Sequence, residues 1–181
     1  KTVTAAATVA RRGVNTLVLV HRVELLKQWQ ERLQSFLGVG KGVVGTIGGG
    51  KIERVAASRG RLDGKIISLL VIDELHEWAE ENWTILTGGA MKRPDSQILQ
   101  ITTAGYDLET ICGKEYEKGR RIEAGEVGNP TYLFRWHAPA DTASIHDREA
   151  WAAANPSMGT LVHPEILADL AINIAEADFR R

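Results

Sequence analysis

The feature that most constrains this chain is an apolar run that ends abruptly in two adjacent acids. Residues 69–72 read Leu-Leu-Val-Ile and are followed directly by Asp73 and Glu74. A continuous apolar run of this kind is typical of a strand buried on both faces of a parallel sheet. Such a strand delivers the residues after it to the carboxyl edge, where ligands of open α/β sheets bind. The run therefore predicts a central strand that presents two carboxylates at a binding edge.

Two interpretations of the acid pair stay open. In a nucleotide hydrolase, Asp73 would hold Mg²⁺ directly or through water, and Glu74 would orient or deprotonate the attacking water. The alternative is a strand followed by the start of a helix, since acidic residues favour first helical turns. The nearby His76 is expected either to relay polar contacts beside Glu74 or to cap that helix.

Strand and helix patterns alternate along the whole chain, which predicts the α/β class with a mainly parallel sheet. Strands are expected at residues 15–21, 42–47, 66–72, 97–103 and 131–136. Helices are expected from residue 1 to a stop at Gly13, at residues 24–37, 77–89, 107–123 and 147–154, and from Pro164 onward. The opening helix has no preceding strand, so we expect that the chain has lost its beginning.

Apolar residues at helical spacing predict which helix faces are buried. Asp107 is expected to cap the helix over 107–123. The predicted buried stripe of helix 24–37 contains Leu25, Leu26, Trp29, Leu33, Phe36 and Leu37. That of the last helix contains Ile166, Leu167, Leu170 and Ile174.

Composition excludes several classes of function. With 44% hydrophobic and 25% charged residues among 181, the chain is an ordinary globular protein of about one domain. A net charge of −1 gives no global attraction to nucleic acid, which leaves only a local basic patch. Cys112 is the single cysteine, and the five histidines form no i, i+4 pair, so disulfides and zinc sites are not predicted. No stretch reaches the roughly 20 apolar residues of a membrane span.

Two segments compete as the phosphate-binding loop. Lys1 and Thr2, followed at once by a small-residue helix, fit the end of the G-x-x-x-x-G-K-[ST] motif, in which the Lys meets the phosphates and the hydroxyl binds Mg²⁺. The alternative interpretation is that Lys1 and Thr2 are a chance Lys-Thr pair without a role in phosphate binding. Residues 45–51 (GTIGGGK) also have the glycine and lysine spacing, but Ile52 follows and cannot bind Mg²⁺; the alternative for them is a flexible surface turn.

Polar residues also follow two other predicted strands. Thr102 and Thr103, before Ala104, would contact Glu74 or the attacking water and couple hydrolysis to motion, or would simply be β-branched residues ending a strand. His21 and Arg22 would grip a nucleic-acid phosphate, or form a solvated helix start.

Tryptophans and arginine pairs allow both functional and structural readings. The five tryptophans would be stacking platforms for bases, or parts of the core or of a subunit contact. Trp29, on an apolar helix face, is expected in the core. Arg120-Arg121 and Arg180-Arg181 would sense a neighbouring subunit's phosphate or be solvated surface.

Four runs, in order, resemble the ATPase domain of the large terminase subunit of tailed phages. They are residues 73–78 (DELHEW), 101–107 (ITTAGYD), 150–159 (AWAAANPSMG) and 177–181 (ADFRR). The family couples ATP hydrolysis to pumping viral DNA into a preformed capsid. The resemblance implies a RecA-like P-loop fold with ATP and Mg²⁺. It also implies that Lys1 and Thr2 bind phosphate and metal, Asp73 binds metal, Glu74 is the catalytic acid, and residues 102–104 are the coupling motif.

The resemblance implies an organisation and partners as well. Residues 1–160 would be the ATPase core, lacking its first strand and most of the phosphate loop, and residues 161–181 a helix leading to a nuclease domain. The implied partners are double-stranded DNA, a portal protein, a small terminase subunit and further copies in a ring, in the host cytoplasm.

The first 70 residues resemble a related group. Residues 16–29 (TLVLVHRVELLKQW), 47–51 (IGGGK) and the Asp-Glu-x-His pattern at 73–76 are similar to superfamily-two helicases. Divergence of a shared P-loop core, or a join or deletion near residues 60–70, would explain this. A helicase or restriction-type translocase is therefore the second hypothesis, and a non-catalytic remnant the third.

Overall fold

The structure is a computed structural model that describes residues 2–40, 43–44, 67–90, 94–105, 107–140 and 142–179. The chain divides into two compact units, Lys1–Glu117 and Lys118–Arg181. The first contains α1 (Thr2–Arg12), β1 (Thr16–Leu19), α2 (Val23–Leu37), β2 (Leu69–Asp73), η1 (Leu75–Glu77), α4 (Glu80–Ala90), β3 (Gln97–Ile101) and the start of α5 (Ile111–Glu123). The second contains the end of α5, α6 (Arg148–Ala154), α7 (Pro164–Asn173) and α8 (Glu176–Phe179). The predicted domain boundary at residue 160 stays a prediction.

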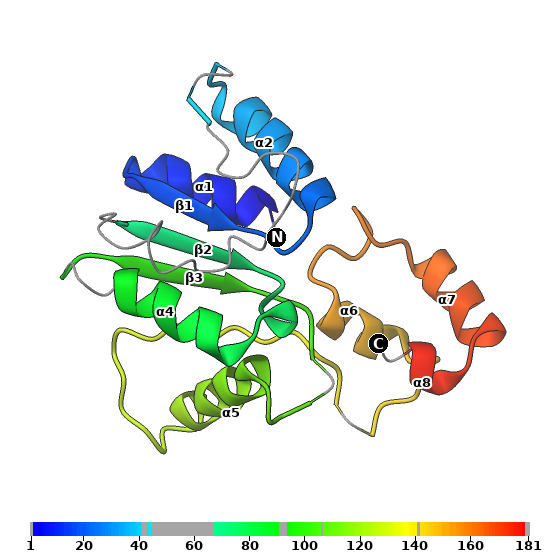
Figure 1. The fold of residues 1–181 in the computed structure, drawn as a ribbon. Coiled ribbons are helices and arrows are strands. Elements are labelled where there is room, and N and C mark those ends of the chain that lie inside the picture. Colours follow the sequence, from blue (N-terminus) through cyan, green and yellow to red (C-terminus); the bar gives the residue numbers. More distant parts are fainter. Residues whose placement is uncertain are drawn as a thin grey trace. The chain divides into compact units, whose positions relative to one another are not determined.

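The three strands form a parallel sheet in the order β1-β2-β3 (Figure 1). Leu19 pairs with Ile72 across the first ladder, and Asp73 pairs with Ile101 across the second. The strands therefore end close to the same line, and the residues that follow them meet at one carboxyl edge. The prediction of an α/β fold with a mainly parallel sheet is confirmed.

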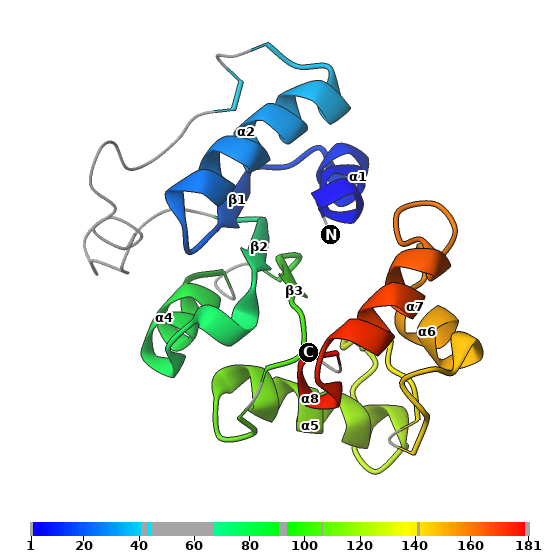
Figure 2. The same cartoon turned by 90° about the vertical axis from the view of Figure 1, so that its right-hand side faces the viewer.

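The central strand β2 is buried on both faces, as its continuous apolar run predicts. Leu69 and Val71 pack with α1 and α2, whereas Leu70 and Ile72 pack with α4 and the start of α5. All four side chains are at most 1% exposed. Figure 2, which looks onto the carboxyl edge, shows α1 and α2 on one side of the sheet and α4 and the start of α5 on the other. Each fully buried side chain of this size contributes about 1.5–3 kcal/mol, so β2 is the main anchor of the unit.

Two helices cover the β2 face to which Asp73 belongs. In α1, Ala5 and Ala6 are almost fully buried, because small side chains let the helix lie close to the sheet. The helix ends at Gly13, whose φ of +57° lies in the left-handed region, as predicted. In α2, Trp29 and Leu33 are the most buried residues. Phe36, predicted in the same stripe, is 50% exposed, so the buried stripe is narrower than predicted.

Several predicted elements differ from the structure in the first unit. The helix predicted over 77–89 is α4, which begins three residues later than predicted, at Glu80, after the 3-10 turn η1. Asp107 does not cap α5: its carboxylate accepts the amide N–H of Glu109 in a preceding turn. Thr110 accepts the amide N–H of Gly113 at the first turn of α5 instead. Of the strand predicted over 42–47, only residues 43 and 44 are described, and they form a turn and a bend.

The strand predicted over 131–136 is wrong. Residues 132–140 have irregular structure and follow α5. The Lys118 ammonium lies 4.5 Å from the centre of the Tyr132 ring. The Phe134 ring lies against Gly119, where an added Cβ would come within 2.2 Å of it. Alternating apolar residues therefore pack on a helix here, where the pattern predicted a sheet.

The second unit is built around Trp151. Asp147 caps α6 as an acceptor for the amides of Glu149 and Ala150. The Trp151 indole N–H donates to the Ile145 carbonyl at 2.8 Å, and its ring lies 6.2 Å from that of Phe179. Pro164 opens α7 as predicted. The predicted buried stripe of α7 is wrong: Ala171 is its buried residue, whereas Ile166 is 57% exposed.

In the part of the chain that the structure describes, no helix is long and apolar enough to cross a membrane.

A pair of glycine substitutions tests the packing of α5. Alanine favours a helix over glycine by up to about 1 kcal/mol, so Gly88→Ala in α4, where nothing lies within 4 Å of the added Cβ, should stabilise the chain. At Gly113 the added Cβ would come within 2.3 Å of the Leu108 backbone. We expect Gly113→Ala to lower the free energy of unfolding by about 1–3 kcal/mol in urea titrations. Equal stabilisation by both variants would contradict the packing of Leu108 on α5.

Candidate functional site

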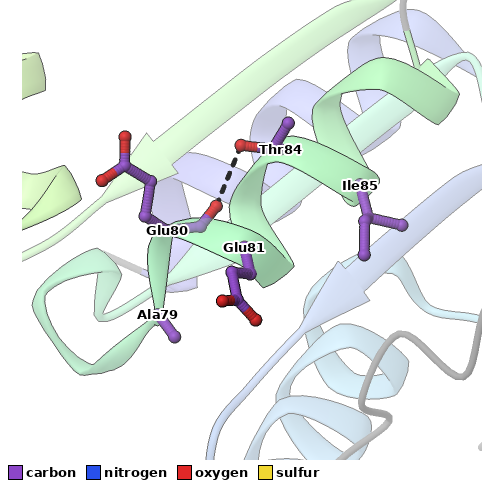
Figure 3. A pocket seen from close by; sticks show the side chains of 5 residues that line it. All are labelled: Ala79, Glu80, Glu81, Thr84 and Ile85. Carbon is purple, nitrogen blue, oxygen red and sulfur yellow. Dashed lines mark hydrogen bonds between the residues drawn. The ribbon is translucent and has the colours of Figure 1, made fainter.

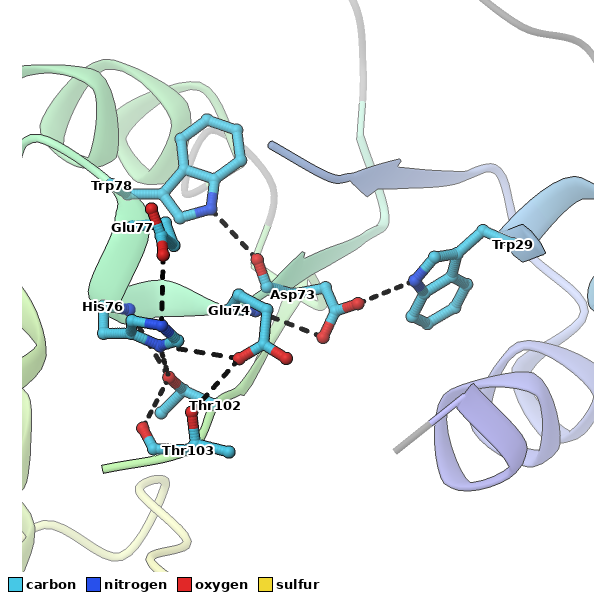
Figure 4. A network of polar contacts seen from close by, with 8 residues as sticks. All are labelled: Trp29, Asp73, Glu74, His76, Glu77, Trp78, Thr102 and Thr103. Atoms are coloured by element: carbon cyan, nitrogen blue, oxygen red, sulfur yellow. Dashed lines mark hydrogen bonds and ion pairs between the residues drawn. The ribbon is translucent and has the colours of Figure 1, made fainter. Parts of the chain in front are cut away.

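Asp73 ends β2 and is held from three sides (Figure 4). The indole N–H of Trp29 donates to its Oδ2 at 2.7 Å, and the Glu74 amide donates to its Oδ1 at 3.1 Å. The indole N–H of Trp78 donates to its backbone carbonyl at 3.0 Å. Only 5% of Asp73 is exposed, so the carboxylate is fixed in orientation and largely removed from water.

The donors to the Asp73 carboxylate are neutral N–H groups, and among the described residues no lysine or arginine forms an ion pair with it. A buried carboxylate whose charge is not compensated favours a bound cation. The described residues contain no cluster of three or more His, Cys, Asp or Glu that could enclose a metal. This donor set fits Mg²⁺, which uses one or two protein ligands and completes its shell with water and phosphate oxygens.

Glu74 has a left-handed backbone conformation, with φ +53° and ψ +59°. Among the non-glycine residues that the structure describes, only Glu74 has a positive φ. Its amide N–H also donates to the Ile101 carbonyl at 2.8 Å, which ties the strained residue to the end of β3. Its carboxylate accepts the Thr103 hydroxyl at 3.4 Å and lies 3.5 Å from Nδ1 of His76. Strain of this kind, about 1–3 kcal/mol, is concentrated at functional sites.

His76 connects η1 to the end of β3. Its Nδ1 lies 2.9 Å from the Thr102 hydroxyl oxygen, and its Nε2 lies 3.5 Å from the Glu77 carboxylate. The Thr102 hydroxyl donates in turn to the Thr103 carbonyl at 2.8 Å. The structure therefore brings together Glu74, His76 and both threonines, in line with the interpretation of the sequence in which the threonine hydroxyls and His76 contact Glu74.

Thr2 lies at the first turn of α1 and is 9% exposed. Its hydroxyl accepts Nη1 of Arg32 at 3.2 Å. Arg32 follows Trp29 by one turn of α2, so one helix contacts both Thr2 and Asp73. Lys1 lies outside the described residues.

His21 and Arg22 follow β1 at the same edge of the sheet, since Leu19 pairs with Ile72. Nδ1 of His21 is buried without a hydrogen-bond partner among the described residues. Arg22 is exposed and begins α2 without a side-chain cap. The competing phosphate loop over 45–51 lies outside the described residues.

Two contributors were not predicted. Trp29 was expected in the core, and Arg32 was not among the candidate residues. The available signal was the indole N–H, because a buried tryptophan needs a hydrogen-bond acceptor. Sequence spacing alone does not reveal which acceptor it meets.

A separate pocket lies at the start of α4 (Figure 3). It is lined by Ala79, Glu80, Glu81, Thr84 and Ile85. The Glu80 carboxylate accepts Nζ of Lys114 at 2.6 Å, and this bond raises the pKa of Lys114 above its ordinary value. None of the predicted site residues lines this pocket, so it is not the candidate site.

Comparison with families of known proteins now adds to this geometry. Residues 14–121 match the family described as terminase large subunit, ATPase domain. The chain belongs to this family. The match runs from the segment that resembles helicases into α5. It therefore includes the helicase-like run at residues 16–29 and the terminase-like runs at residues 73–78 and 101–107. None of the curated proteins compared matches the chain.

Comparison with solved structures finds a terminase as well. The crystal structure of the HK97 bacteriophage large terminase matches with a TM-score of 0.63 at 14% sequence identity. The match covers 87% of this chain and 35% of that chain, so this chain spans about a third of the HK97 protein. At this identity the match establishes the shared fold, and it extends beyond the family match into the second unit.

The backbone of Glu74 yields a prediction that does not depend on activity. Both Glu74→Gly and Glu74→Ala remove the same carboxylate, but only glycine adopts the left-handed region without steric cost. We expect the glycine variant to be more stable than the alanine variant by about 1 kcal/mol in urea unfolding. An alanine variant of equal or higher stability would contradict the backbone conformation of Glu74.

Proposed function

We propose that the chain is the ATPase motor domain of a viral DNA-packaging terminase, which couples ATP hydrolysis to translocation of double-stranded DNA into the capsid. Membership of the terminase ATPase family supports the reaction class. The observation that carries the proposal is the buried Asp73 carboxylate at the carboxyl edge, oriented by neutral donors and without a compensating cation among the described residues.

The nucleotide would lie between the start of α1 and the end of β2. Lys1 would contact the β- and γ-phosphates, and the Thr2 hydroxyl and the Asp73 carboxylate would hold Mg²⁺. Bound Mg²⁺ neutralises phosphate charge as it develops in the transition state. The N-terminal amides of α1 add affinity for an anion.

Glu74 would orient the attacking water and accept its proton. The Thr103 hydroxyl and His76 hold the Glu74 carboxylate beside the end of β3. A change in the hydrogen bonding of Glu74 on hydrolysis would therefore reach Thr102 and Thr103 directly. This contact network is the physical basis for proposing residues 102–104 as the coupling motif.

Double-stranded DNA would contact the surface near His21 and Arg22, where the exposed Arg22 offers a phosphate contact. In the complete machine the chain would act in a ring of copies, with a portal protein and a small terminase subunit, in the host cytoplasm.

The central test substitutes the catalytic acid conservatively. Glu74→Gln keeps the side-chain volume but cannot accept a proton, so kcat for ATP hydrolysis should fall by about a hundredfold or more while nucleotide affinity stays within about twofold. The matched control is Glu81→Gln, an exposed acid in α4, which should leave kcat unchanged. The measurement is phosphate release and nucleotide binding with the 181-residue chain.

Three results would contradict the proposal. Absence of nucleotide binding by the unmodified chain would favour the non-catalytic remnant. Equal kcat in Glu74→Gln would remove Glu74 from the reaction. Stimulation of hydrolysis by single-stranded but not by double-stranded DNA would favour the helicase reading.

A further inference from the structure

Trp29 has a contact that core packing does not require. Its indole is 3% exposed and comes from α2, yet its N–H donates to the Asp73 carboxylate at 2.7 Å rather than to a backbone carbonyl of its own helix. The Trp151 indole, buried to a similar degree, donates to the Ile145 carbonyl. Trp29 is therefore a buried donor aimed at a residue that the proposed function assigns to the metal.

The two donors to Asp73 have different origins. The Glu74 amide is the next residue of the chain and meets Oδ1 through local geometry. Trp29 lies 44 residues away in sequence and meets Oδ2. With one donor on each oxygen, rotation of the carboxylate about its bond to Cβ breaks at least one hydrogen bond.

The charge of the donor matters as much as its position. An arginine or lysine at this distance would compensate the carboxylate and weaken its attraction for a cation. An indole N–H carries no net charge, so it orients the carboxylate and leaves its negative charge available. Partners of ligating carboxylates are known to change metal affinity about 10–100-fold when they are removed.

We propose that Trp29 is a positioning residue that sets the magnesium affinity of Asp73. This inference rests on the proposed function, because it assigns Asp73 to the metal. Arg32, one turn further along α2, contacts the hydroxyl of Thr2, the second expected ligand. One helix thus orients both protein ligands of the metal.

The experiment measures how the affinity for a fluorescent ATP analogue depends on MgCl₂ concentration. In Trp29→Phe, which keeps an aromatic ring but removes the donor, the half-maximal Mg²⁺ concentration should rise about tenfold or more. Affinity at saturating Mg²⁺ should stay within about threefold of the unmodified chain. The matched control is Trp151→Phe, which loses a buried indole hydrogen bond in the other unit and should not change the Mg²⁺ dependence.

Each outcome decides the question. If the unmodified chain fails to bind the analogue at any Mg²⁺ concentration, the proposed function fails and this inference with it. If it binds and Trp29→Phe shows the same Mg²⁺ dependence, this inference alone is overturned. A loss of affinity that persists at saturating Mg²⁺ also overturns it, because that result indicates general damage to the site.

A second measurement applies if Trp29→Phe does not fold. In ¹H–¹⁵N NMR spectra of the unmodified chain, MgCl₂ with a non-hydrolysable ATP analogue should shift one indole N–H resonance. Asp73→Asn should abolish that shift and leave the Trp151 resonance in place. An unchanged set of indole resonances in the unmodified chain, under conditions in which the analogue binds, would overturn the proposal.

Discussion

The burial of β2 on both faces of the sheet determines where the candidate site lies. Its apolar side chains alternate between the α1–α2 side and the α4–α5 side. A slip by one residue would exchange the two sets of side chains between the faces and move Asp73 to the α4–α5 side. With the strand fixed, Asp73 must follow on the α1–α2 side, where Trp29 meets it. The packing of the core therefore determines the position of the Asp73 carboxylate.

Adjacent carboxylates thereby receive different surroundings. Asp73 is 5% exposed and held by neutral donors, which suits a metal ligand. The Glu74 side chain is 23% exposed, and its left-handed backbone turns it toward His76 and Thr103. These different surroundings support the two roles proposed for the adjacent acids, metal binding for Asp73 and activation of water for Glu74. The strain at Glu74 is sustained because its amide is bonded to β3.

Sequence reasoning predicted what depends on local pattern. The run over 69–72, the alternation of strands and helices, the end of α1 at Gly13 and the helix over 147–154 all have local signals. Sequence reasoning failed where the same apolar pattern is compatible with packing against two different elements. The alternating apolar residues around Tyr132 and Phe134 are compatible with a strand in a sheet. They are equally compatible with an irregular segment that packs on α5, which is what the structure shows. The apolar residues of α7 predicted a buried stripe. Burial of a helix face depends on which element packs against it, and the sequence of the helix does not reveal that element.

The polar contacts of the site show the same division. The carboxyl edge was predictable, because parallel strands deliver their following residues to one side. The hydrogen bonds of Trp29 and Arg32 were not, because each joins residues at least 30 positions apart in sequence. Such contacts depend on how α2 packs on the sheet and on α1. Even so, the candidates from the sequence at residues 74, 76 and 102–103 form one contact network, as one of the two interpretations of these residues expected.

The account depends most on a single magnesium nucleotide joining the start of α1 to the end of β2. The most direct measurement is a crystal structure of the chain with Mg²⁺ and a non-hydrolysable ATP analogue. The account predicts a metal about 2.1 Å from the Thr2 hydroxyl, with Asp73 bound to it directly or through one water. A nucleotide bound at another edge of the sheet, or a metal out of reach of Asp73, would contradict it.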